Sequence, residues 1–213
     1  MDWTDYTRFS ITLFALINPF TKIPYTLSSA GNYGARAILV MALSSTITMI
    51  VLLTTMHWAG EKILLVLGTS LASFQIGGGL VILLSGLALL TDAKKQDVSQ
   101  PLTSDFDHSN FVKIGVSPLG IPMLAGAAAI AKVISEAQPG YGVENSLHLD
   151  LMIGLVCLVS GAIIASSAIL FRVLGPAFFS VMSRLAGLIV VSVAIEVMWH
   201  GVSAHVATLV AQH

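Results

Sequence analysis

Residues 17–24, INPFTKIP, place two prolines in the middle of a mainly apolar stretch of the chain. A second stretch, VSPLGIP at residues 116–122, carries two prolines in the same way. Proline removes a backbone donor and clashes with the carbonyl four residues earlier, so a helix does not run regularly through two of them. We therefore expect helix breaks at four positions: Pro19, Pro24, Pro118 and Pro122.

The composition around these breaks is typical of a membrane protein. Of the 213 residues, 55% are hydrophobic and 10% are charged, against about 25% charged residues in an ordinary globular domain. The formal net charge of -1 leaves no basic face for phosphates, which excludes nucleic acid as a partner. The lone cysteine, Cys157, allows no internal disulfide. Residues 1–20 lack the features of a cleaved signal peptide, so we expect the first apolar run to stay in the protein.

Long uncharged runs predict six membrane spans, since a helix needs about 20 apolar residues to cross the hydrocarbon core. Three runs are uninterrupted: 24 uncharged residues between Arg36 and Lys62, 29 between Lys62 and Asp92, and 21 between Asp150 and Arg172. The other three spans are irregular or carry charges: residues 114–131 with two prolines, residues 9–30 with Lys22, and residues 176–199 with Arg184 and Glu196. Residues 93–110 and 138–148 are polar and predict loops.

Lysine and arginine are distributed unevenly between the two predicted faces of the membrane. One face collects six of them, Arg36, Lys94, Lys95, Lys113, Arg172 and Arg184, and the other has three, Arg8, Lys62 and Lys132. Because short cytoplasmic loops carry an excess of positive charge, this bias predicts an inner-membrane protein with both termini on the non-cytoplasmic side.

The two halves of the chain resemble each other weakly. Besides the proline pairs, residues 73–77 can be aligned with residues 183–187 in the third span of each half. Three spans is an odd number, so the second copy would cross the membrane in the opposite direction, as in many secondary transporters. We expect an all-helical single transmembrane domain of two inverted repeats, residues 1–92 and 111–213, joined by a cytoplasmic linker at 93–110.

Unwound segments inside the membrane leave main-chain polar groups without helical partners. Half-helix ends supply partial charges of both signs, which suit the carboxylate and ammonium of a zwitterionic amino acid. The alternative is that the prolines only kink helices that pack around glycines. The predicted substrate-binding residues are Asn18, Pro19, Phe20, Thr21, Ser117, Pro118, Gly120 and Gly126, with Gly78 leaving room beside them.

Two ionisable residues inside the predicted spans are candidates for function, because charges within lipid are costly. Lys22 could bind a substrate carboxylate, pair with Glu196, or extend its ammonium to water. Glu196 stands close to the end of its helix, so an interfacial position and a role in proton coupling are both open.

These residues resemble the MarC family, whose described members include small neutral amino acid transporters. The resemblance runs nearly end to end, through FALINPFTKIPYTLSSAGN, FQIGGGLVILLSG, SPLGIPMLAG and RLAGLIVVSVAIEVMWHGV. Two positions depart from the family pattern: Ala127 and Ala128 stand where Pro-Gly is usual, and Glu196 stands where glutamine is usual. The resemblance implies a carrier of glycine, alanine or a similar amino acid.

Several other functions compete with a carrier. A channel would need a continuous polar lining, and an accessory subunit would bind no solute. An intramembrane enzyme is not expected, because the spans offer only Lys22 and Glu196 as ionisable groups for catalysis. The histidines and acidic residues show no ligand-like spacing, so we expect neither a metal site nor a cofactor. Expected partners are the amino acid and the lipid bilayer, and the sequence leaves a homo-oligomer open.

Overall fold

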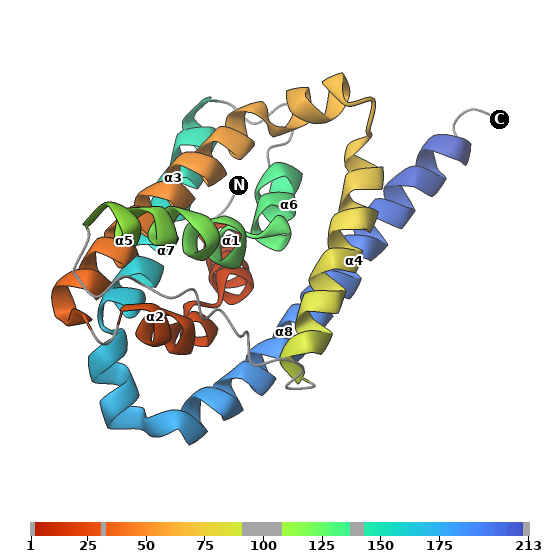
Figure 1. The fold of residues 1–213 in the computed structure, drawn as a ribbon. Coiled ribbons are helices and arrows are strands. Elements are labelled where there is room, and N and C mark those ends of the chain that lie inside the picture. The colour runs from red at the N-terminus through yellow and green to blue at the C-terminus, as the bar shows by residue number, and fades with distance from the viewer. Residues whose placement is uncertain (1–2, 31–32, 91–107, 137–142, 211–213) are drawn as a thin grey trace.

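The computed structural model describes residues 3–30, 33–90, 108–136 and 143–210, and every element in these ranges is helical. Figure 1 shows a bundle from which one pair of long helices stands apart. The elements are α1 (Trp3–Ile17), η1 (Pro19–Lys22), α2 (Ile23–Ala30), α3 (Ala35–Val66), α4 (Leu71–Leu90), α5 (His108–Ile114), η3 (Gly115–Leu124), α6 (Ala127–Glu136), α7 (Val143–Ala165) and α8 (Ser167–Val210).

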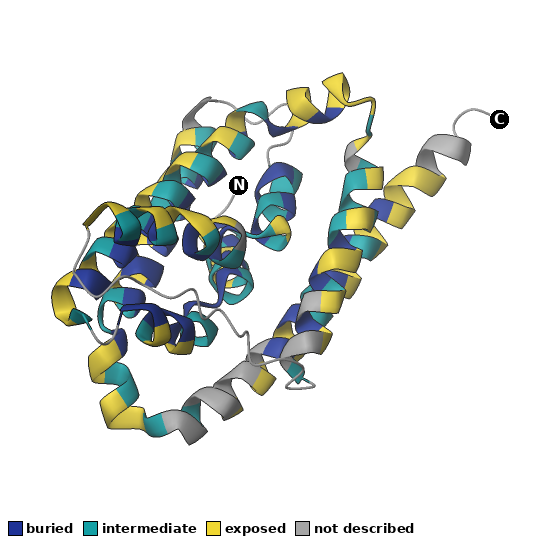
Figure 2. Ribbon diagram, viewed as in Figure 1, coloured by how far each residue is buried: buried dark blue, intermediate teal, exposed yellow. Residues whose placement is uncertain are grey.

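The bundle, which we call the body, contains every element except α4 and α8. Its apolar core is shared among elements distant in the chain, with Leu13 of α1, Met41 of α3, Phe111 of α5 and Ile153 of α7 each at most 2% exposed. Helix α3 contacts α5, η3, α6 and α7, so it is the helix around which the body packs. Figure 2 shows the buried residues gathered in this part of the molecule.

Helices α4 and α8 form a pair, which we call the arm. Helix α4 packs against α8, and a separate small core holds Ile82 of α4 against Val190 and Ala194 of α8. Glycine makes the close approach possible, since a Cβ on Gly86 would lie 3.0 Å from the backbone nitrogen of Val191. The outer faces of both helices carry exposed apolar side chains (Figure 2), as expected for surfaces that meet lipid.

Three helices within the described ranges are long and apolar enough to cross a membrane: Ala35–Val66, Asn145–Ala165 and Gly187–Val206. They correspond to the predicted second, fifth and sixth spans. Helix α4, at the predicted third span, has 20 residues and carries no charged side chain. The structure therefore supports a helical membrane protein.

The connection after the second predicted span lies further along the chain than expected. Helix α3 continues through Glu61 and Lys62, and the turn that ends it is at Gly68, whose φ is 69°. The amides of Gly68 and Thr69 bond back to the carbonyls of Leu65 and Leu64 at 3.0 and 2.9 Å, which is a Schellman arrangement. Charged residues at the end of a span do not stop a helix, whereas a glycine that adopts positive φ does.

The two predicted loops, and the connection between the predicted fifth and sixth spans, also contain more helix than expected. Residues 108–110 belong to α5 and residues 143–148 to α7, while residues 93–107 and 138–142 lie outside the described residues. Arg172 and Arg184 do not flank an open loop, because α8 begins at Ser167 and bends only at Gly175. The helix resumes at once after Gly175, since Pro176 fits the first turn, where its missing amide costs nothing. Helix α8 also extends past Trp199 to Val210.

Candidate functional site

The first proline-bearing segment leaves the helical path at Asn18. Its backbone is left-handed, with φ 45° and ψ 67°, a conformation that asparagine tolerates better than most residues. The amide of Asn18 completes α1 by bonding the carbonyl of Phe14 at 2.9 Å, and the chain then forms the short 3-10 turn η1. Helix α2 follows with Pro24 in its first turn, where proline is tolerated. The predicted break at Pro19 is present.

Within the described ranges, few groups form hydrogen bonds with the polar atoms of this break. The hydroxyl of Thr21 donates to the carbonyl of Asn18 at 2.9 Å, and the amide of Ile23 bonds the carbonyl of Phe20. Asn18 is only 7% exposed, and its side-chain Nδ2 has no hydrogen-bond partner among the described residues. A buried, unpaired amide nitrogen is uncommon in folded proteins and needs an explanation.

The second proline-bearing segment is irregular over η3. Ser117 (φ -143°, ψ 127°) and Ile121 (φ -126°, ψ 126°) are extended, because each precedes a proline whose ring disfavours the helical conformation. The chain closes with a wide turn, in which the amide of Ala125 bonds the carbonyl of Gly120 at 2.9 Å. The break predicted from Pro118 and Pro122 is therefore present as well.

The two breaks meet inside the body. Segments η1 and η3 contact each other, and η3 also lies along α3. Gly120 sits so close to this helix that a Cβ would lie 3.1 Å from Cβ and Cγ2 of Thr48. The predicted residues at 18–21 and 117–120 thus come from two distant parts of the sequence into one region of the fold. Gly126 follows at the start of α6, where its carbonyl accepts the amide of Ile130 at 3.1 Å.

Gly78 lies on the arm, facing the body. A Cβ on Gly78 would come 3.0 Å from the Cβ of Ala131 in α6, while one on Gly77 would meet no atom within 4 Å. The absence of a side chain at Gly78 therefore allows α4 and α6 to approach closely, and its predicted role beside a substrate stays a prediction.

Lys22 and Glu196 lie in different places. Lys22 ends η1, beyond the C-terminus of α1, and its carbonyl accepts the hydroxyl of Thr26 at 3.0 Å. The carboxylate of Glu196 lies 3.2 Å from Nε2 of His200 in the next turn of α8, and among the described residues it forms no ion pair with Lys22. Glu196 lines a cavity together with Thr12 of α1. Lys22 lies beyond the end of α1 at Ile17, and the helix rises about 7.5 Å from Thr12 to that end. Carboxylate binding and proton coupling stay predictions for these two residues.

A charged cavity of about 330 Å³ lies between the arm and the body. Sequence reasoning missed most of its lining, which includes Arg8 of α1, Gln75 of α4, Lys132 and Glu136 of α6, and Glu196 and His200 of α8. Lys132 forms an ion pair with Glu136. Both Lys132 and Glu136, and likewise Glu196 and His200, are four residues apart on a helix, and this spacing was a signal that each pair shares one face.

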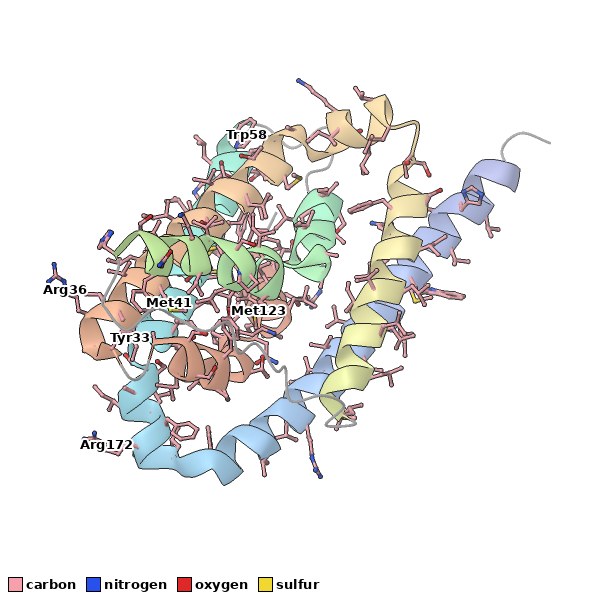
Figure 3. All side chains as sticks on the ribbon, viewed as in Figure 1. Tyr33, Arg36, Met41, Trp58, Met123 and Arg172 are labelled. Carbon is pink, nitrogen blue, oxygen red and sulfur yellow. The ribbon has the colours of Figure 1, made fainter. Side chains whose placement is uncertain are left out.

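The two ends of the body carry different side chains. Figure 3 shows Trp58 toward one end of α3, Arg36 at the other end of α3, and Arg172 of α8 on the same side of the molecule as Arg36. At the Trp58 end, its indole nitrogen donates to Oδ2 of Asp150 at 2.7 Å, and Tyr6 donates to Asn145 at 3.0 Å. Which face is cytoplasmic stays a prediction.

A family model described as MarC family integral membrane protein matches residues 3–206, which is nearly the whole chain. The chain belongs to the MarC family. Two curated relatives, both named UPF0056 membrane proteins, cover most of its length. YhcE of Escherichia coli (strain K12) is 27% identical over 201 residues, 94% of this chain and 93% of that protein. The protein of Aquifex aeolicus (strain VF5) is 24% identical over 200 residues, 92% of this chain and 91% of that protein.

A third MarC-family relative carries a location in its name. The UPF0056 inner membrane protein MarC of Citrobacter koseri is 25% identical over 203 residues, covering 90% of this chain and 91% of that protein. No solved structure matches the chain. The proline-bearing breaks described above lie within the part of the chain that the MarC family model covers.

Proposed function

We propose that this MarC-family protein is a secondary transporter that carries small neutral amino acids, such as glycine and alanine, across the inner membrane by alternating access. The family membership and the inner-membrane name of a relative support the location. The broken helices support the carrier, because unwound segments that meet inside a bundle offer polar groups to a small solute. The protein is proposed to work without a metal or cofactor and to be no enzyme.

The proposed architecture is the six-span inverted repeat. In this arrangement α1, η1 and α2 of residues 1–92 correspond to α5, η3 and α6 of residues 111–213. Helices α4 and α8 would then be the third spans of the two repeats, and they pack on each other in the arm. Alternating access would follow from movement of the arm against the body, with access to the breaks changing from one side to the other.

One observation carries the proposal: the side-chain amide of Asn18 is buried at the break, and no group in the described part of the chain accepts from its Nδ2 donors. An unsatisfied buried donor destabilises the protein by about 1–3 kcal/mol. A substrate carboxylate would accept from Nδ2 and remove that cost. Burial of the amide also strengthens such a bond, since water does not compete for it.

The test is uptake of radiolabelled alanine into proteoliposomes by the Asn18→Gly variant. Glycine adopts the left-handed backbone of Asn18 without strain, so the variant removes the amide and keeps the break. A hydrogen bond to a charged group contributes about 1.5–3 kcal/mol, so we expect uptake efficiency to fall about 10- to 100-fold.

Asn145→Ala is the matched control, because it removes another partly buried asparagine amide, bonded to Tyr6 away from both breaks. This control should take up alanine as the unmodified protein does. Equal uptake by the Asn18→Gly variant and the control would contradict the role of the amide. Non-saturable uptake without counter-transport would point to a channel. A purified protein that shows no uptake and no thermal stabilisation by glycine or alanine would be an accessory subunit.

A further inference from the structure

The cavity between the arm and the body is built from four helices that are distant in the chain. Helix α1 contributes Arg8 and Thr12, α4 contributes Gln75, α6 contributes its ion-paired Lys132 and Glu136, and α8 contributes Glu196 and His200. Its volume of about 330 Å³ lies in the range of small-molecule sites. At about 30 Å³ per water molecule, it has room for a small amino acid together with several waters.

The cavity wall carries one ion pair and, on two other helices, one cation and one carboxylate that are not paired with each other. Lys132 and Glu136 neutralise each other on α6. Arg8 makes no ion pair with the described residues, and the carboxylate of Glu196 has only His200, which is charged only when protonated. One unpaired cation on α1 therefore faces the same space as one carboxylate on α8, and the two do not touch each other.

We propose that this cavity is a second binding site for zwitterionic amino acids, separate from the helix breaks, in which Arg8 holds the carboxylate and Glu196 holds the ammonium. A guanidinium binds a carboxylate through two parallel hydrogen bonds, and a carboxylate accepts from an ammonium. A ligand with only one charge would bind either Arg8 or Glu196 and leave the other side chain without a partner. The site therefore takes neutral zwitterions in preference to simple acids or amines.

The choice of an amino acid as the ligand rests on the proposed transport function. The placement of Arg8 and Glu196 on two different helices that line the cavity does not depend on that function. A site at the boundary between arm and body would capture an amino acid before it reaches the breaks. Gln75 of α4 adds a neutral donor and acceptor to the wall.

The test is equilibrium binding to purified protein that carries Asn18→Gly, so that the break does not dominate the signal. Three probes are used: alanine, propionate, which lacks the ammonium, and alaninamide, which lacks the carboxylate. Arg8→Gln should weaken alanine and propionate about tenfold and leave alaninamide unchanged. Glu196→Gln should weaken alanine and alaninamide about tenfold and leave propionate unchanged.

Arg8 and Glu196 are both exposed, so neither Arg8→Gln nor Glu196→Gln should unfold the protein. Arg172→Gln and Glu61→Gln are matched controls, because they remove an exposed charge from α8 and α3 outside the cavity, and they should bind all three probes as the parent does. The double variant Arg8→Glu with Glu196→Arg reverses the two walls and should restore part of the alanine affinity.

The outcome separates this proposal from the transport function. Suppose that Arg8→Gln weakens only alanine and propionate and Glu196→Gln weakens only alanine and alaninamide, while the unmodified protein takes up no alanine. The cavity site is then supported and the carrier function is refuted. If uptake is present but Arg8→Gln and Glu196→Gln bind all three probes like their controls, the cavity site is refuted and the carrier stands. Absence of any alanine binding also overturns the cavity site.

Discussion

Replacing Gly86 by alanine should weaken the packing of α4 against α8. An added Cβ would lie 2.8 Å from Cγ2 of Val191, 3.0 Å from its backbone nitrogen and 3.2 Å from the carbonyl oxygen of Gly187. The methyl group of Val191 can rotate away, but the two backbone atoms can yield only if the helices separate. Overpacking of this kind costs about 1–3 kcal/mol.

The helix itself gains from the substitution, because alanine is favoured over glycine inside a helix by about 1 kcal/mol. Gly77→Ala in the same helix isolates this gain, since a Cβ there would meet no atom within 4 Å. The difference in the free energy of unfolding between the two variants should therefore be about 1–3 kcal/mol in favour of Gly77→Ala.

Thermal unfolding of both variants in one detergent, followed by circular dichroism, measures this difference. In a chain of this size, 1 kcal/mol corresponds to about 2–4 °C in Tm. A Gly86→Ala protein that melts at the same temperature as the Gly77→Ala protein, or above it, would refute the close packing of the arm.

Two further substitutions test the irregular backbone. Gly175→Ala should lower stability by about 1–3 kcal/mol because φ 70° and ψ 166° suit glycine alone, although a Cβ there would meet nothing within 4 Å. The control is Gly154→Ala in α7, which is equally free of contacts and should melt no lower than the unmodified protein. Gly120→Ala should reduce alanine uptake at equal protein amount, because its Cβ would lie 2.9 Å from the carbonyl oxygen of Gly115 and would displace η3 from Thr48. Unchanged uptake would show that the shape of η3 does not matter.

The helix breaks could be predicted from sequence because the rule that causes them is local. Pro118 restricts the backbone of Ser117 whatever surrounds it, and the structure has Ser117 extended. Asn18 next to Pro19 is a similar case, since asparagine tolerates the left-handed conformation that ends α1. The end of α3 could also have been placed from sequence, because glycine commonly ends a helix and Gly68 does so here.

The cavity could not be predicted, because it depends on which helices lie beside one another. Arg8 and Lys132 both contribute to its wall, although 124 positions separate them in the chain. Hydrophobic runs indicate which segments cross the membrane. A helix that is apolar on every side gives little indication of which of its faces packs against which other helix. The length of α8 was missed for a different reason. Gly175 and Pro176 together suggest the end of a helix, whereas α8 bends there and continues.

The pairing of α4 with α8 has a consequence for how the protein is made. Helix α4 ends at Leu90, and the last described turn of α8 ends at Val210, 120 residues later. At about 5–20 residues per second, the ribosome needs about 6–24 seconds to synthesise that interval. Throughout this time, the glycine-lined face of α4 lies in the bilayer or the insertion machinery without its partner. The arm is therefore assembled after synthesis of the body helices, and α8 completes the packing of a helix that was synthesised much earlier.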